Sequence, residues 1–304
     1  MKRPGILLIL MFLLTACSPS VIASEVASKA TPTPTFAATR LGSAERDISY
    51  CTLDAMQKMD VYYPSSGGPW PVFLYVHGGS WRELDKAEGE GWRYLNDSGI
   101  LVVSLNYRLA ATNVKFPAMI EDLKCAVRHL RANASYYNLD PNHIAVLGAS
   151  AGGHLVALLG VADEAAGWET SEYPDQSSRV QGVVDISGPT DLTLEMPNGI
   201  AMAIYYAFTK LPGTDAEVLV AASPVTYVTP DDPPFLILQG DKDPYIPVNQ
   251  AEALHTRLTE AGVSSTLVVV KNGDHGLQGA DASPTQEEIS EIILEFLKEV
   301  LLIP

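Results

Sequence analysis

One serine of this chain stands where a hydroxyl group could act as a nucleophile. Ser150 is the centre of residues 148–152, Gly-Ala-Ser-Ala-Gly, which link an apolar run that predicts a strand (144–147) to one that predicts a helix (155–159). A serine hydroxyl is a weak nucleophile, and a sharp turn between strand and helix can expose it beside a base. Glycine on both sides allows such a turn, because a side chain there would crowd the backbone. We therefore expect Ser150 to be a catalytic nucleophile.

A base and an acid that could activate this serine follow it along the chain. His275 lies in the polar segment 272–276, directly after a predicted strand, where its imidazole could accept the serine proton. Asp241 and Asp243 follow the preceding predicted strand, and a carboxylate there would orient the histidine and stabilise its cation. We favour Asp243 over Asp241 for this role. His154, four residues after the serine, is interpreted as a structural residue of the helix.

A glycine-rich segment, residues 77–81 with the sequence His-Gly-Gly-Ser-Trp, follows another predicted strand. Acyl transfer places negative charge on the carbonyl oxygen, and backbone N–H groups aimed at that oxygen stabilise the charge. We expect the N–H groups of Gly79, Ser80 and Ala151 to form this oxyanion hole. The histidine that begins the segment would brace the loop, and Trp81 would either line the substrate pocket or pack in the interior.

These candidate residues require a scaffold that brings distant parts of the chain together. Eight runs of apolar or alternating residues predict strands, and segments with helical spacing separate most of them. The first two runs predict an antiparallel hairpin, and the alternation that follows predicts parallel strands with helices on both faces of the sheet. The predicted strands are 47–53, 58–63, 71–76, 100–105, 143–147, 182–186, 234–239 and 265–270.

The remaining segments complete an α/β architecture. Further helices are predicted at 86–95, 117–130, 200–208, 248–261 and 284–301, and residues 188–230 leave room for a small cap only. Ser283 is the expected N-cap of the last helix, with Pro284 at its first position. Parallel sheets gather functional residues at the carboxyl ends of their strands, and the candidate residues all follow strands. We therefore predict a mostly parallel eight-stranded sheet with helices on both faces and these residues at one edge.

The N-terminal part of the sequence differs from the rest. Two basic residues precede an apolar run up to residue 14, which is typical of a signal peptide and too short to span a membrane. Residues 14–17, Leu-Thr-Ala-Cys, resemble a bacterial lipobox, in which the cysteine is lipidated. The alternative is a plain secretory signal that has Cys17 by chance. Residues 18–40 are rich in Ser, Ala, Thr and Pro and predict a flexible tether.

These features predict three parts of the chain. We expect a signal peptide at 1–16, a lipidated Cys17 and tether at 17–44, and a catalytic domain at 45–304. The chain would then be an exported bacterial lipoprotein, held at the membrane by its lipid anchor alone. Its place would be the outer side of the cytoplasmic membrane, the periplasm or the outer membrane.

The composition argues against several classes of function. Acidic residues outnumber basic ones by 36 to 20, and the net charge of −16 disfavours binding to nucleic acid or to an anionic surface. No His-Glu-x-x-His or Cys-x-x-Cys pattern supports a zinc site, and no dinucleotide motif follows a strand, so no cofactor is expected. Cys51 and Cys125 could form a disulfide in an exported protein or remain as buried thiols.

Six motifs together give the chain a family resemblance. It is similar to α/β-hydrolases of the bacterial carboxylesterase and lipase branch, with hormone-sensitive-lipase-like and feruloyl-esterase-like members, over about residues 45–303. The motifs are residues 77–81, Asn-Tyr-Arg-Leu at 106–109, Phe-Pro-Ala at 116–118, Gly-Ala-Ser-Ala-Gly-Gly at 148–153, Gly-x-x-Asp-Pro at 240–244 and Asp-His-Gly at 274–276.

Three departures from that pattern favour the feruloyl-esterase-like side. Ser80 stands where many relatives have a third glycine, and Ala149 stands where hormone-sensitive-lipase-like enzymes often carry Asp. The long N-terminal cap of the latter enzymes is replaced by the tether. The resemblance therefore implies a small-cap esterase rather than a true lipase.

We expect a serine carboxylic-ester hydrolase that acts on small or aryl acyl esters. Ser150 would attack the ester carbonyl, His275 would transfer the proton, and Asp243 would orient His275. The partner is a small-molecule ester, without nucleic acid. Two alternatives stay open at this point: an amidase or exopeptidase with the same triad, and a tethered binding protein without catalysis.

Overall fold

A computed structural model describes residues 36–111, 113–208 and 216–303. Its centre is one sheet of eight strands in the order β1-β2-β4-β3-β5-β6-β7-β8. The β2 strand pairs antiparallel with β1 and β4, and every other pair is parallel. The strands are β1 (Ala44–Ser49), β2 (Lys58–Tyr62), β3 (Trp70–Val76), β4 (Leu101–Leu105), β5 (Leu139–Ala149), β6 (Gly182–Ile186), β7 (Phe235–Gly240) and β8 (Ser265–Val270). The predicted mostly parallel eight-stranded fold is confirmed.

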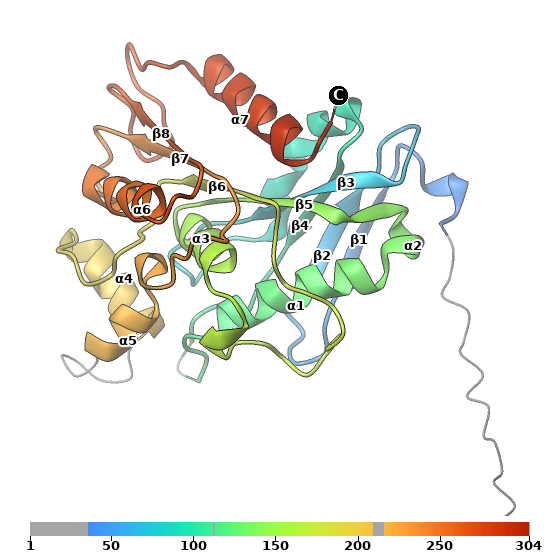
Figure 1. Ribbon diagram of the computed structural model, residues 1–304, viewed down its shortest axis with the longest axis horizontal. Helices are drawn as coiled ribbons and strands as arrows, with labels where there is room; N and C mark the ends of the chain where they lie inside the picture. Colours follow the sequence, from blue (N-terminus) through green and yellow to red (C-terminus); the bar gives the residue numbers. More distant parts are fainter. Residues whose placement is uncertain (1–35, 112, 209–215, 304) are drawn as a thin grey trace, which may run out of the picture. The chain divides into compact units, whose positions relative to one another are not determined.

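Helices connect the strands and cover both faces of the sheet (Figure 1). The α-helices are α1 (Ala118–Ala132), α2 (Ala134–Tyr137), α3 (Ala151–Val161), α4 (Asn198–Phe208), α5 (Ala216–Ala221), α6 (Val248–Glu260) and α7 (Gln286–Val300). Turns of 3₁₀-helix are η1 (Ala38–Arg40), η2 (Lys86–Ser98), η3 (Glu164–Ala166) and η4 (Pro224–Thr226).

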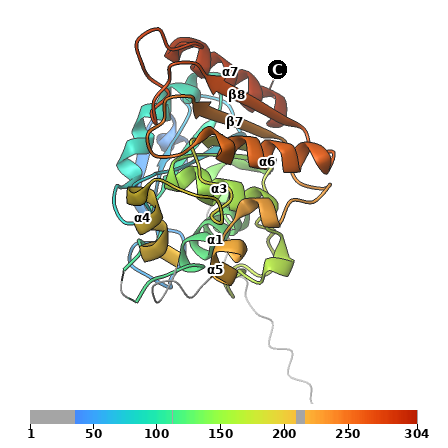
Figure 2. The same cartoon turned by 90° about the vertical axis from the view of Figure 1, so that its left-hand side faces the viewer.

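Alternating side chains of the strands pack into two separate cores. On β3, Val72 and Leu74 belong to the core that contains apolar side chains of α1, α3 and α6. Phe73 and Tyr75 face the other way, into the core formed with η2 and α7. This is the period of two that a strand buried on both faces requires. Figure 2 shows β7 and β8 running between α6 and α7, so the second half of the sheet is also covered on both sides.

The cap is small, as predicted. Helices α4 and α5 lie between β6 and β7 in the chain and line a shared cavity of about 590 Å³. That cavity contains none of the candidate catalytic residues. The far end of α4 is attached to the main body, because Phe208 packs edge-on against Trp81, with ring centroids 4.9 Å apart.

The packed part of the chain begins earlier than the boundary predicted at residue 45. Phe36 lies edge-on to the ring of Trp70, with centroids 5.3 Å apart, and Arg40 pairs with Glu45 at 2.9 Å. The tether predicted at 17–44 therefore overlaps residues that pack on the domain, because Phe36 contacts the rings of Tyr63 and Trp70. The predicted signal peptide and Cys17 lie outside the described residues. None of the helices that the structure describes combines the length and the hydrophobicity of a membrane-spanning segment.

The first strand and the last helix have boundaries that differ from the predicted ones. The first strand covers 44–49 rather than 47–53. Its pairing with β2 runs from Ala44 to Ser49, with a register irregularity between Glu45 and Ile48, and residues 50–53 lie outside the sheet. The N-cap of the last helix is Thr285 rather than Ser283. Thr285 and Glu288 form a capping box, in which each side chain bonds the other residue's backbone. The observed N-cap lies two residues after the predicted one.

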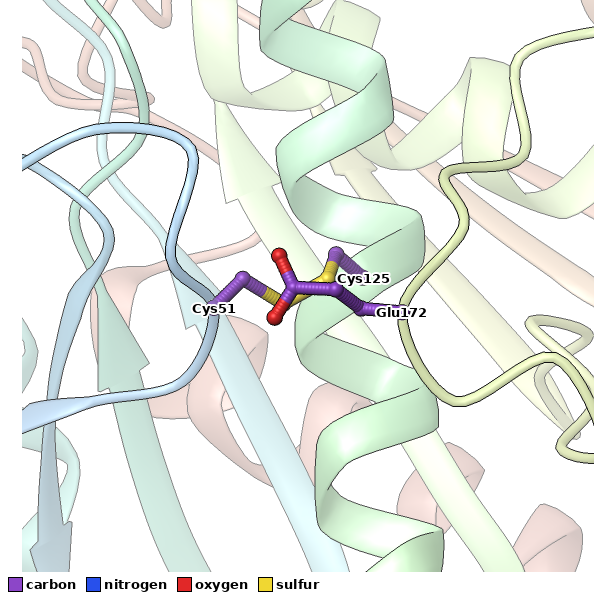
Figure 3. Close-up of side chains that lie close together, drawn as sticks. All are labelled: Cys51, Cys125 and Glu172. Carbon is purple, nitrogen blue, oxygen red and sulfur yellow. A yellow bond between two sulfur atoms is a disulfide. The ribbon is translucent and has the colours of Figure 1, made fainter.

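Cys51 and Cys125 are joined by a disulfide, the first of the two alternatives (Figure 3). It ties the loop after β1 to α1 across a sequence separation of 74 residues. The carboxylate of Glu172 lies beside the sulfur atoms and accepts a hydrogen bond from the N–H of Thr52 at 3.0 Å. Because both sulfur atoms are used in the bond, this group has no thiolate to offer a metal ion.

Candidate active site

Ser150 occupies a strained turn between β5 and α3. Its backbone has φ 55° and ψ −120°, a conformation that residues other than glycine rarely adopt. Its N–H donates a hydrogen bond to Ile186 O at 2.8 Å. The two glycines of the motif are needed for space as well as for flexibility. A Cβ atom on Gly148 would lie 2.2 Å from Gly152 O, and one on Gly152 would lie 2.2 Å from Val76 O. The turn predicted from Gly-x-Ser-x-Gly is therefore packed against the sheet, with the serine at its apex.

His275 and Asp243 come from different strand ends and form a hydrogen-bonded pair. Nδ1 of His275 lies 2.7 Å from Oδ2 of Asp243, whose side chain is 1% exposed. A carboxylate oxygen only accepts, so Nδ1 carries the proton and Nε2 keeps a lone pair for a substrate-side proton. Asp241 lies instead near Lys242, with 3.6 Å between Oδ2 and Nζ. The structure thus places Asp243, and not Asp241, against His275.

The environment of Asp243 keeps it ionised. Burial alone would raise the pKa of this carboxyl. The hydrogen bond from His275 and those from the N–H groups of Ile246 and Tyr245 outweigh the effect of burial, and the pKa lies below its usual value. An ionised Asp243 can hold the imidazole in one tautomer and stabilise its cation.

Ser150 and His275 line one cavity of about 400 Å³, together with the loop after β3. The loop contributes Gly78, Gly79 and Ser80 to the wall of this cavity. The parallel strands β3, β5, β7 and β8 all end on this side, which is why four segments far apart in the chain meet here. The catalytic residues predicted from the sequence therefore share one site in the structure.

The expected oxyanion donors have N–H groups available for a ligand. Gly79 has φ +88° and Ser80 has φ 52°, so the loop turns sharply at both residues. Among the described residues, no group accepts a hydrogen bond from the N–H of Gly79, Ser80 or Ala151. Ala151 begins α3, where helix N–H groups lack intrahelical partners and favour negative charge. The arrangement offers a developing anion several donors.

Trp81 does not line the cavity, and this decides between the two roles left open for it. The side chain is 2% exposed, and its Nε1 donates to Nδ1 of His154 at 3.3 Å. Nε2 of His154 lies 2.7 Å from Ala222 O, and burial lowers the pKa of His154 to about 4. Both residues pack beneath the cap, and His154 is structural, as expected.

Other residues near the site were not singled out from the sequence. Gln239, buried at the end of β7, donates from Nε2 to Oδ2 of Asp243 at 3.0 Å. The signal in the sequence that could have identified Gln239 is its polar side chain near the end of an otherwise apolar strand. Tyr245 lies edge-on to the His275 ring, with centroids 5.2 Å apart. The rest of the cavity wall is mixed in character and comprises Tyr75, Leu84, Glu88, Ala149, Ile200 and Gly276.

Comparison with known proteins supports this architecture. The BD-FAE family model matches residues 59–258, a range that includes Ser150 and Asp243 and ends before His275. Among curated proteins of Mycobacterium tuberculosis, the esterase LipC is 32% identical over 252 residues, 77% of this chain and 62% of LipC. The probable carboxylic ester hydrolase LipM is 30% identical over 263 residues, 82% of this chain and 60% of LipM. The chain thus spans about three fifths of the length of these relatives.

Solved structures show the same fold. A truncated carbohydrate esterase from gut microbiota has a TM-score of 0.74 and 28% identity, and the match covers 87% of this chain and 100% of that one. Esterase 2 of Thermogutta terrifontis with butyrate bound has a TM-score of 0.70 at 23% identity, covering 86% of this chain and 95% of that one. The second likeness concerns the fold alone.

Proposed function

Because the chain belongs to the BD-FAE family of α/β-hydrolases, we propose that it is a serine carboxylic-ester hydrolase. The observation that carries the proposal is the 2.7 Å contact between His275 and Asp243 beside the cavity that Ser150 lines. The esterase names of LipC and LipM support the same chemistry.

The proposed reaction proceeds through an acyl-enzyme. Oγ of Ser150 attacks the ester carbonyl carbon while Nε2 of His275 takes the serine proton. The carbonyl oxygen becomes an anion that the N–H groups of the loop after β3 and of Ala151 stabilise. The C–O bond to the alcohol breaks, and His275 gives its proton to the leaving oxygen. Water, deprotonated by His275, then attacks the acyl carbon, and Ser150 leaves with the proton.

The substrates in this proposal are small or aryl acyl esters. A cavity of about 400 Å³ accommodates a short acyl chain or one aromatic ring rather than a long lipid. Aromatic and apolar side chains on its wall, such as Tyr245 and Ile200, suit such groups. The carbohydrate esterase among the structural neighbours supports an ester as the substrate.

The proposal also includes export and lipid anchoring through Cys17. A disulfide between Cys51 and Cys125 supports an oxidising compartment outside the cytoplasm. The small-molecule ester would be met on the outer side of the cytoplasmic membrane, in the periplasm or at the outer membrane.

A pair of chromogenic substrates tests the proposed activity. The purified protein is assayed with p-nitrophenyl butyrate and with the matching p-nitroanilide, alongside Ser150→Ala. We expect hydrolysis of the ester, much slower hydrolysis of the anilide, and a loss of ester turnover of roughly 10⁴–10⁶-fold in the variant. Preference for the anilide would identify an amidase. Absence of turnover and of labelling by a fluorophosphonate probe would identify a non-catalytic binding protein.

A further inference from the structure

Tyr107, in the loop after β4, lies directly beneath the loop that carries the expected oxyanion donors. Its side chain is fully buried, and its hydroxyl lies 3.1 Å from His77 O and 3.0 Å from Gly78 O. Burial raises the pKa of Tyr107, so the hydroxyl keeps its proton. Because carbonyl oxygens only accept, Tyr107 is the donor to both of them.

His77 supplies a second donor to the same carbonyl. Its Nδ1 lies 3.0 Å from Gly78 O, and its ring stacks on the ring of Tyr107 with centroids 4.4 Å apart and planes at 14°. Burial lowers the pKa of His77, so the ring is neutral near pH 7 and Nδ1 carries its proton. The Gly78 carbonyl is therefore held by two donors from one side.

The orientation of this carbonyl determines the direction of the next N–H. In a trans peptide the C=O and N–H bonds point in opposite directions. The peptide group that joins Gly78 to Gly79 is flanked by residues without side chains, whose backbones have little conformational preference. Its orientation therefore depends on its hydrogen-bond partners. With Gly78 O held toward Tyr107, the N–H of Gly79 points away from Tyr107, and Gly79 itself lines the cavity.

We propose that Tyr107 is a positioning residue that aims the Gly79 N–H at the carbonyl oxygen of the substrate. The proposal rests on the proposed esterase function and adds a residue that never touches the substrate. Its contribution is specific to the transition state, because the oxygen needs this donor most when it carries a full negative charge.

The test removes the hydroxyl of Tyr107 and keeps its aromatic ring. In Tyr107→Phe we expect kcat for p-nitrophenyl butyrate to fall roughly 10- to 100-fold, with KM changed by less than about threefold. A trifluoromethyl ketone, which forms an anionic adduct with the serine, should bind more weakly by the same factor. The matching trifluoromethyl carbinol, a neutral competitive inhibitor that forms no adduct with the serine, should bind to the variant as tightly as to the wild type.

Tyr137→Phe is the matched control. Tyr137 is also a buried tyrosine, and its hydroxyl contacts Nε2 of His129 at 2.9 Å, away from the cavity. This variant should lose comparable thermal stability and keep its kcat. Equal effects of the two variants on kcat, or equal weakening of both inhibitors by Tyr107→Phe, would overturn the proposal.

A second variant keeps the proposal testable if Tyr107→Phe does not fold. His77→Phe retains a stacked ring and removes only the other donor to Gly78 O, so we expect the same loss of kcat on a smaller scale. An unchanged kcat in a folded His77→Phe variant would contradict the mechanism. Failure of the wild-type protein to hydrolyse any ester would instead refute the proposed function and leave the variants without an effect to measure.

An independent observation concerns the charge of the substrate. Glu88, on η2, lines the same cavity and accepts a hydrogen bond from the hydroxyl of Tyr75 at 3.4 Å. Within the described ranges, no lysine, arginine or histidine pairs with this carboxylate. An unpaired carboxylate on the wall of a pocket repels anions and accepts hydrogen bonds from hydroxyl or ammonium groups.

We infer that Glu88 selects neutral hydroxylated or cationic esters over anionic ones. This inference also rests on the proposed function. Wild-type protein should have a higher kcat/KM for p-nitrophenyl butyrate than for the anionic p-nitrophenyl hemisuccinate. In Glu88→Gln the ratio of these two kcat/KM values, neutral over anionic, should be smaller by roughly five- to tenfold. Glu90→Gln removes an equal charge from the same element, at a residue paired with Arg46 at 3.0 Å and outside the cavity wall.

The control separates a local effect from the effect of net charge. Glu90→Gln should leave the ratio of kcat/KM values close to that of the wild type. If both variants narrow the ratio equally, or if neither does, Glu88 does not select substrates by charge. Neither outcome bears on whether the protein is an esterase, because both require measurable turnover of the neutral ester.

Discussion

The side chain of Gln239 donates to Oδ2 of Asp243 at 3.0 Å, the same carboxylate oxygen that accepts from Nδ1 of His275. Oδ1 of Asp243 accepts from two backbone N–H groups, at 2.8 Å and 3.0 Å. Nε2 of Gln239 also donates to Ile246 O at 3.0 Å, which joins the end of β7 to the loop that carries the acid. Hydrogen bonds to both carboxylate oxygens thus hold Asp243 in the position from which it orients His275.

This arrangement predicts different outcomes for two neighbouring acids. In Asp243→Asn, the amide can present N–H to the histidine and stabilise the wrong tautomer, so we expect kcat to fall by about 10⁴-fold. Asp241→Asn should stay within a fewfold of the wild type, because neither a hydrogen bond nor an ion pair joins Asp241 to His275 in the described residues. Steady-state kinetics with p-nitrophenyl butyrate measures both, and comparable losses in the two variants would contradict the assignment of Asp243.

The disulfide predicts a loss of stability on its removal. It closes a loop of 74 residues, and in the chain-entropy view such a cross-link stabilises the folded state by about 4 kcal/mol. The double variant Cys51→Ala, Cys125→Ala should therefore melt on the order of 10 °C lower than the wild type under oxidising conditions. Differential scanning calorimetry measures the change.

Reduction provides the control for that prediction. Dithiothreitol should lower the Tm of the wild type and leave that of the double variant unchanged. The rate of ester hydrolysis at 25 °C should survive in the variant, since neither cysteine lines the cavity. A Tm that does not respond to reduction in the wild type would show that the disulfide contributes no stability.

Asp185 predicts a pH dependence of stability. Its side chain is fully buried on β6 and accepts one hydrogen bond, from the N–H of Gly188 at 3.0 Å. Burial raises the pKa of Asp185 to about 7. An aspartate in the unfolded chain has a pKa of about 3.9, so the folded state binds more protons between these two pKa values. Its stabilising contribution is complete below about pH 4 and is lost as the pH rises through about 7.

Asp185→Asn should remove that loss, because an amide resembles the protonated acid and does not ionise. We expect the free energy of unfolding of the variant, relative to the wild type, to rise by roughly 2–3 kcal/mol between pH 5 and pH 8. Urea denaturation at the two pH values measures this difference. Asp175→Asn, at an exposed aspartate, is the control and should show no such change. A difference independent of pH would rule out titration of Asp185 in this range.

The proposed lipid anchor predicts where the protein is found. Cys17→Ser should move it from the membrane fraction to the soluble fraction after expression in a bacterial host. The esterase activity per molecule should be unchanged, because Cys17 lies outside the range 45–304 that is predicted to be the catalytic domain. Immunoblotting of fractionated cells measures the distribution, and a variant that still sediments with membranes would refute anchoring through Cys17.

Local patterns in the sequence were sufficient for the architecture. Apolar runs such as 71–76 and 234–239 predict strands because a strand buried on both faces needs apolar side chains on both. Parallel strands end on one side, so residues that directly follow strands, such as Ser150 and His275, could be expected to meet without knowledge of any contact. The glycines around Ser150 were equally informative, because the turn they allow is local.

The tertiary structure decided what depends on contacts between distant segments. Asp241 and Asp243 follow the same strand, and only the packing of the loop determines which one faces His275. The sequence left open whether Trp81 packs in the interior and whether Cys51 bonds Cys125, and it contains no signal that Phe36 joins an aromatic cluster. The hydroxyl of Tyr107 reaches the loop after β3 through hydrogen bonds that span 30 and 29 residues of the sequence. Periodicity along a chain specifies elements and their order, whereas the direction of a side chain within a site is set by neighbours that only the folded chain brings together.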